Sequence, residues 1–128
     1  MKRVSSPEFP RPLSPREKEV AGWLIANGGA SKEEKTEYLA QLQRASVIRR
    51  CPCGCASIDL AIDGRESSEA SIVPFGDFIT PESQHGIFVF SRGGLLAGVE
   101  IYQLAADFLP AEFPRPTSFT PFDAAKKG

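Results

Sequence analysis

The chain places all of its helical signals before all of its strand signals. Over its 128 residues, two helix-forming segments come first, at about 14–27 and 31–44, and several short β-type segments follow them. No strand–helix–strand alternation occurs, which argues against a Rossmann or flavodoxin-like parallel sheet. The order therefore predicts an α+β fold, with an N-terminal helical hairpin packed on a mostly antiparallel sheet of about 4-5 strands.

Two capping boxes mark the starts of the helices. Ser14 is followed three residues later by Glu17, and the same spacing joins Ser31 to Glu34. In this pattern each side chain satisfies a free backbone amide at the helix start. The "NGG" after the first segment suits a helix end, because glycine readily adopts the left-handed conformation found there. Two short helices so closely joined predict a helical hairpin.

The strand segments are apolar and alternating. "SVIRR" and "CASIDLAI" flank "PCG", whose glycine suits a three-residue hairpin turn. In that register Cys51 and Cys55 face each other, and Cys53 lies at the tip. "IFVF", "SRGG" and "LLAGVEIYQL" predict a second hairpin. "IVPFGDFI" predicts a short irregular strand, which its proline confines to an edge or a bulge.

The chain length fits a single domain. Residues 1–13 carry prolines and no periodicity, so we expect them to form an extended N-terminal arm. Residues 14–128 then form one α+β domain. Its last part, residues 105–128, is rich in proline, which disfavours regular structure, and in phenylalanine, which predicts packing along the body of the domain.

Composition excludes several classes of partner. The formal net charge is -1, which argues against a nucleic-acid-binding protein with a basic stripe. No apolar run approaches the roughly 20 residues that span a bilayer, and the N-terminus lacks the apolar core of a signal peptide. We therefore expect no nucleic-acid or membrane partner and a cytoplasmic location.

All three cysteines fall within "CPCGC". Together with His85, the only histidine, Cys51, Cys53 and Cys55 supply the four ligands that a structural zinc site needs. The C-x-C-x-C spacing differs from the C-x2-C of usual zinc hairpins. A redox pair is a second interpretation, since neighbouring arginines stabilise a thiolate. A third is that small cysteines simply tolerate a tight turn, with His85 an ordinary surface histidine.

Polar residues alternate with apolar ones on the strand segments. Asp59 lies between two apolar residues, and so does Glu100. If the two hairpins are neighbours in one sheet, both carboxylates share a face with Arg49 and Tyr102. This face is either a partner-binding patch or the ordinary solvated side of an antiparallel sheet.

Catalytic signatures are missing from the sequence. "SRGGLLAG" contains paired glycines but matches neither the P-loop nor the dinucleotide-binding pattern, and no H-E-x-x-H is present. No catalytic or cofactor-binding residue is therefore assigned. A small-molecule enzyme with Trp23 and Tyr38 lining its pocket stays an alternative, although aromatic residues at helical spacing are usually core.

The segments "RRCPCGCASIDL" and "GIFVFSRGGLLAGVEIYQL" resemble those of small bacterial proteins of uncharacterised function. Their pattern is a helical start, a Cys-rich turn ending in "CGC", a "GGLL-G-E-Y" hairpin and a proline-rich close. The resemblance implies a shared small α+β fold and brings no activity or catalytic residue. Small bacterial proteins of this kind include toxin-neutralising immunity proteins, a fold-level analogy.

These observations favour a non-enzymatic bacterial interaction module that binds another protein, either immunity-like or regulatory. The alternatives are a metal- or thiol-based site at the cysteines and a small-molecule-binding enzyme.

Overall fold

The computed structural model describes residues 9–122; the rest of the N-terminal arm and the last residues of the tail lie outside this range. In chain order its elements are α1 (Pro15–Asn27), α2 (Lys32–Leu42), β1 (Ala45–Arg50), β2 (Ile58–Ile62), β3 (Val73–Ile79), β4 (His85–Arg92), β5 (Leu95–Gln103) and β6 (Thr120–Pro121), with short 3-10 helices at Pro81–Ser83 and Pro116–Ser118. Both predicted helices are confirmed, and each begins with its capping box.

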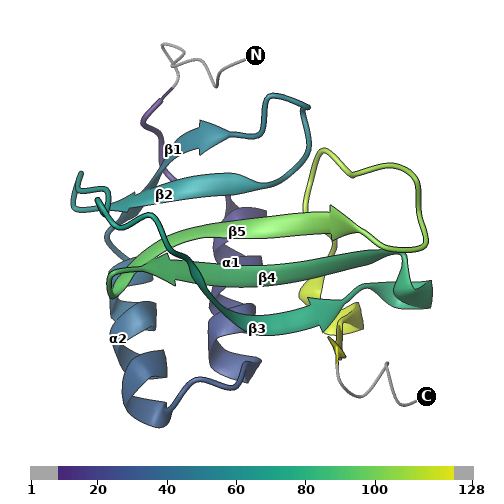
Figure 1. The fold of residues 1–128 in the computed structure, drawn as a ribbon, viewed down its shortest axis with the longest axis horizontal. Helices are drawn as coiled ribbons and strands as arrows, with labels where there is room; N and C mark the ends of the chain where they lie inside the picture. Colours follow the sequence, from purple (N-terminus) through teal and green to yellow (C-terminus); the bar gives the residue numbers. More distant parts are fainter. Residues whose placement is uncertain (1–8, 123–128) are drawn as a thin grey trace.

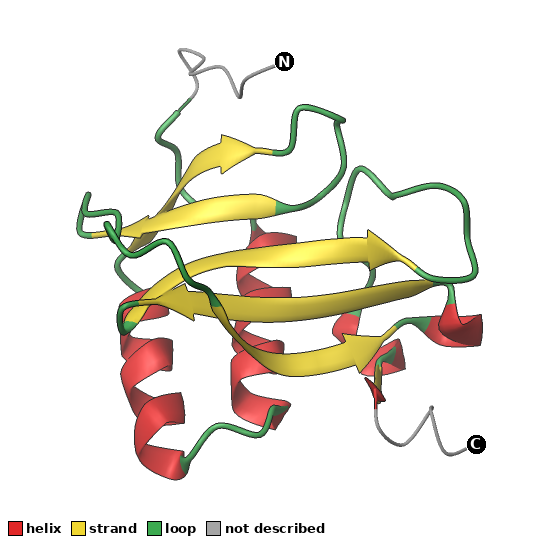
Figure 2. Cartoon of the chain, viewed as in Figure 1, coloured by secondary structure: helices red, strands yellow, loops and turns green. Residues whose placement is uncertain are grey.

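The described strands form one antiparallel sheet in the order β1-β2-β5-β4-β3-β6. The α+β class and the antiparallel sheet are thus confirmed (Figure 2). The sheet has six strands, slightly more than expected. The additional strand, β6, comes from the proline-rich tail and pairs with Phe78 and Ile79 of β3. Pro121 is tolerated there because β6 is a short edge strand.

Both helices cover the same face of the sheet (Figure 1). The core lies between the two layers and combines one face of α1 with the apolar residues of the central strands. Its largest fully buried members from α1, β4 and β5 are Val20, Leu24, Ile25, Ile87, Val89, Leu96, Val99 and Ile101. No described helix covers the opposite face, which we call the outer face.

The described part of the N-terminal arm lies along the edge strand β1. Arg11 exchanges both backbone hydrogen bonds with Val47, at 3.0 and 2.8 Å. The Arg11 guanidinium also pairs with Glu17 of α1 at 2.8 Å. Burial raises the pKa of Glu17, but hydrogen bonds from Arg11 and Ser14 outweigh it and hold that pKa below its usual value. The arm therefore covers an edge that would otherwise be open to strand pairing.

The C-terminal tail packs on the domain through two of its phenylalanines. Phe113 and Phe119 are buried, whereas Phe108 is 54% exposed. The indole of Trp23 meets the rings of Phe119 and Phe78 edge to face, at centroid distances of 5.7 and 4.7 Å. The tail thus covers part of the core next to α1.

The end of α1 lies directly against β3. A Cβ atom at Gly28 would lie 2.6 Å from the Cα of Gly76, and one at Gly76 would lie 2.5 Å from the carbonyl oxygen of Leu24. Gly76 also has a φ of +67°, a conformation that residues with a Cβ rarely adopt. Glycine at both positions lets the two backbones meet.

The loop that carries the cysteines is longer than the predicted hairpin turn. Strand pairing ends at Arg50 and Ile58, so the connection spans residues 51–57. The amide of Cys51 donates to the Ser57 carbonyl at 3.2 Å, which means that Cys51 and Cys55 do not face each other as expected. The physical reason is that Ser57 is held by β5: its hydroxyl accepts from the amide of Ile101 at 3.0 Å.

Candidate functional site

Three aromatic side chains lie on the outer face, at β4 and β5. Phe88 and Phe90 have ring centroids 6.0 Å apart, and Phe88 lies 5.9 Å from Tyr102. Two of these rings lie over a glycine of the paired strand: Phe90 over Gly98 of β5, and Tyr102 over Gly86 of β4. A Cβ at Gly98 would lie 2.5 Å from the Phe90 ring, and one at Gly86 would overlap the ring of Tyr102. The absence of a side chain at these glycines lets the rings of Phe90 and Tyr102 pack closely against the sheet.

Four charged side chains stand next to these rings. The Nε of Arg49 pairs with Asp59 at 3.1 Å, and the same guanidinium also pairs with Glu66. Arg92 lies over the Phe90 ring, 5.4 Å from its centroid, in a cation–π contact. The Nε of Arg92 is buried and has no hydrogen-bond partner among the described residues. Glu100 stands opposite Phe88 in the pairing of β4 with β5.

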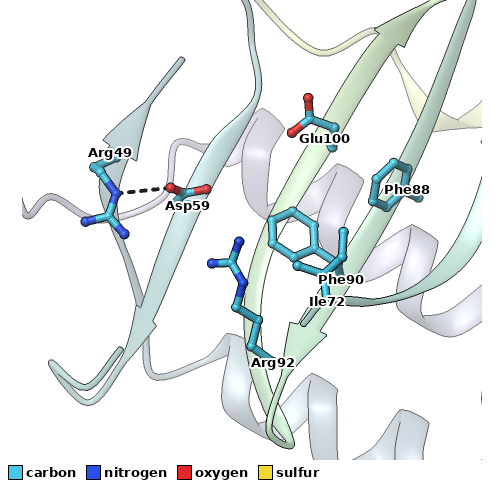
Figure 3. A pocket seen from close by; sticks show the side chains of 7 residues that line it. All are labelled: Arg49, Asp59, Ile72, Phe88, Phe90, Arg92 and Glu100. Atoms are coloured by element: carbon cyan, nitrogen blue, oxygen red, sulfur yellow. Dashed lines mark hydrogen bonds and ion pairs between the residues drawn. The ribbon is translucent and has the colours of Figure 1, made fainter. Parts of the chain in front are cut away.

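These residues enclose an open pocket of about 450 Å³ on the outer face (Figure 3). Its lining comes from β1, β2, β4, β5 and the segment before β3: Arg49, Asp59, Ile72, Phe88, Phe90, Arg92 and Glu100. A pocket that combines an aromatic floor with both signs of charge is suited to binding a segment with apolar and charged groups.

Three of the four residues predicted as a partner-binding patch line this pocket. Arg49, Asp59 and Glu100 come together because β2 pairs with β5. Tyr102 lies on the same face but outside the lining, where its hydroxyl donates to Asp77 at 3.4 Å. Burial, and then the Asp77 charge, raise the pKa of Tyr102 above its usual value.

The remaining lining residues were not predicted from the sequence. Phe88 and Phe90 belong to "IFVF", which predicts one strand of a hairpin but singles out neither ring as a site residue. The available signal was that aliphatic and aromatic residues alternate in this run, which places both phenylalanines on the face opposite Ile87 and Val89. Arg92 and Ile72 carried no signal of their own. Arg92 ends β4 beyond a register shift, and Ile72 lies in the irregular segment before β3.

The cysteine cluster is a separate site at the tip of the β1–β2 connection. The three sulfur atoms all lie within 4.8 Å of one another, and those of Cys51 and Cys53 are 2.9 Å apart. Cys53 is exposed, Cys51 half-buried and Cys55 buried. All three are free thiols.

Hydrogen bonding shifts the pKa values of Cys51 and Cys53 in opposite directions. Two hydrogen bonds to the Cys53 sulfur lower the pKa of Cys53. The first comes from the Cys51 thiol, and the second from the amide of Cys55 at 3.4 Å. The same bond with Cys53 raises the pKa of Cys51 to about 11, and burial adds to that rise. The thiolate therefore forms first on Cys53, the most exposed of the three.

His85 does not belong to this cluster. The three sulfurs form the only group of three or more potential metal ligands among the described residues, and the imidazole lies elsewhere, at the start of β4. Its side chain is buried rather than on the surface, and its Nε2 lies 2.7 Å from the carbonyl oxygen of Phe108. The rings of His85 and Phe108 also meet edge to face at 5.1 Å.

We expect alkylation to distinguish the three thiols. With limiting iodoacetamide at neutral pH, Cys53 should react first, because it is exposed and its pKa is lowered. Cys51 should follow, and the buried Cys55 should react last in the folded chain. Peptide mass spectrometry after timed quenching measures the order. Equal rates at all three positions, or fastest reaction at Cys55, would contradict the described loop.

The aromatic residues of the helices take structural positions. The Trp23 ring is packed between Phe78 and Phe119, as described above. Tyr38 stacks on Phe75, with centroids 4.7 Å apart and an interplanar angle of 25°. Tyr38 also borders a cavity of about 320 Å³ between α2 and β3, but Trp23 does not.

Comparison with known proteins found no match to a protein-family model, a curated protein or a solved structure. Neither described helix has the length and apolar character that crossing a membrane requires.

Proposed function

We propose that this chain is a non-enzymatic protein-binding module of the bacterial cytoplasm, and that its partner binds the pocket on the outer face. The observation that carries the proposal is the pocket of about 450 Å³ on the sheet face that the helices leave uncovered. A regulatory or toxin-neutralising role fits a protein of this kind.

The lining of the pocket favours binding over nucleophilic chemistry. It contains apolar, arginine and carboxylate side chains, but no hydroxyl, thiol or imidazole group. Aromatic residues, phenylalanine among them, and arginine are enriched in the cores of protein interfaces. Phe88, Phe90 and Arg92 would supply such a core.

Charge and packing indicate what the partner presents. The guanidinium of Arg49 is already engaged by two carboxylates, Asp59 and Glu66. Arg92 instead rests on an aromatic ring, and its buried Nε has no partner among the described residues. An Asp or Glu of the partner would pair with the terminal nitrogens of the Arg92 guanidinium. An apolar side chain next to it would cover Phe88.

Selection from a displayed library of random linear peptides tests this proposal. We expect the purified, reduced chain to enrich peptides that carry an acidic residue close to an aromatic or aliphatic one. Arg92→Gln should weaken the affinity of such a peptide about tenfold or more, because it removes a charge-assisted hydrogen bond. Isothermal titration calorimetry measures the affinities.

Arg115→Gln is the matched control, since Arg115 is an exposed arginine outside the pocket lining. It should bind the selected peptide like the wild type. Thermal melting of both variants separates lost binding from lost folding. Unchanged affinity in Arg92→Gln, or an equal loss in Arg115→Gln, would refute the outer-face pocket as the binding site.

A further inference from the structure

The conformation of the cysteine loop is set by its backbone. The amide of Gly54 donates to the Cys51 carbonyl at 3.0 Å, which closes a tight turn in which Gly54 has a φ of +89°. On the other side, the amide of Ala56 donates to the Pro110 carbonyl of the tail at 2.9 Å. The loop is therefore held by β1, β2 and the tail without a disulfide, and it brings the three thiols close together.

The spacing of the sulfurs suits a single ion. With metal–sulfur bonds of about 2.3 Å, three sulfurs arranged around one ion in a plane lie about 4 Å apart. The sulfurs here lie within 4.8 Å of one another, with the closest pair at 2.9 Å. The sulfur–sulfur distance needed around one ion thus lies between the shortest observed distance and the upper limit of the three. Small rotations of the cysteine side chains suffice to reach it.

Arg50 places a positive charge beside the loop. Its Nη2 donates to the carbonyl of Cys55 at 3.2 Å and to that of Ala111 at 3.0 Å. Three thiolates together carry three negative charges. A monovalent or divalent metal ion leaves part of that charge uncompensated. A guanidinium fixed to the backbone of the loop offsets part of the remainder.

The ligand set selects the kind of ion. Thiolates favour soft metals such as copper(I) and zinc, and zinc in a structural site takes four ligands in a tetrahedron. The cluster offers three sulfurs, and no His, Asp or Glu among the described residues joins them. His85, the sequence-based candidate for the fourth position, is hydrogen-bonded to Phe108 instead.

We propose that Cys51, Cys53 and Cys55 bind one copper(I) ion through three thiolates. The three thiol protons are released to solvent as the sulfur–copper bonds form, and no oxidation or reduction takes place. This site is separate from the outer-face pocket, so it goes beyond the proposed protein-binding function, and either proposal can fail alone.

Titration of the whole chain with copper(I) tests the site. The reduced, metal-free protein is titrated under anaerobic conditions in competition with a chromophoric copper(I) chelator. Native mass spectrometry should show one copper per chain, and X-ray absorption should show three sulfur neighbours. In Cys53→Ser we expect two sulfur neighbours and at least about tenfold weaker binding, a loss as large as removing an outer-shell partner of a metal ligand causes.

Cys53 is the informative position because its side chain is exposed, so the substitution leaves the packing intact. Circular dichroism checks that the variant folds. His85→Asn serves as the second variant and should keep three sulfur neighbours. The proposal is overturned if the chelator removes all copper, if Cys53→Ser binds like the wild type, or if nitrogen is a neighbour. Tighter retention of zinc(II) than of copper(I), each against its own chelator, also overturns it.

Discussion

Replacing Gly76 by alanine is expected to lower the free energy of unfolding by about 3 kcal/mol or more, the sum of two penalties. The first is conformational: the φ of +67° places any residue with a Cβ in the left-handed region. The second is steric, because the new Cβ would lie 2.5 Å from the carbonyl oxygen of Leu24, a backbone atom at the end of α1. Relief requires α1 to move away from β3.

Urea denaturation of Gly76→Ala and of Gly29→Ala measures this effect. Gly29 is the matched control, since it lies in the nearby α1–α2 loop and a Cβ there would meet nothing within 4 Å. We expect the control to stay within about 0.5 kcal/mol of the wild type. If Gly76→Ala lost no more than Gly29→Ala, the close packing of α1 on β3 would be wrong.

Replacing Phe113 by alanine is expected to cost about 3–5 kcal/mol, as for other fully buried phenylalanines. The Phe113 side chain is 1% exposed although it belongs to the proline-rich tail. Its backbone carbonyl also accepts a hydrogen bond from Arg16 of α1 at 2.9 Å. The tail therefore contributes to the same core as the helices, and truncating this ring leaves a cavity there.

Phe108→Ala is the matched comparison within the tail. Phe108 is 54% exposed and its main partner is the His85 ring, so we expect a loss of about 1 kcal/mol or less. Both variants are compared by chemical denaturation. Equal losses for the two positions would show that the tail does not enter the core in the way described.

Local chemistry made the helices and the class of the sheet predictable. Each capping box acts within four residues, so Ser14 and Ser31 mark the helix starts whatever packs around them. The alternation of Val99, Glu100 and Ile101 likewise gives the correct faces of β5. Such signals lie within a few neighbouring residues, so they do not depend on contacts with distant parts of the chain.

Long-range contacts determined what was missed. The register of the cysteine loop depends on Ser57 binding β5 and on Ala56 binding the tail at Pro110. The strand β6 exists only because residues 120–121 return to β3. No local pattern specifies such contacts, since their partners lie tens of residues away.

Only part of the candidate pocket could be predicted, because its other residues are also placed by long-range contacts. Asp59 and Glu100 could be placed on one face by alternation alone, given neighbouring hairpins. Arg92 follows a register shift between Phe90 and Ser91 in the pairing of β4 with β5, so simple alternation does not place it. The aromatic floor also depends on Gly98, where the absence of a side chain admits the Phe90 ring.

NMR titration of the labelled chain with a selected peptide tests the central claim most directly. If the outer face binds the partner, the largest amide shifts should fall on Phe88, Phe90, Gly98 and Glu100, with little change in α1 and α2. Shifts concentrated on the helices or on residues 51–57, with the outer face unchanged, would contradict the proposed function.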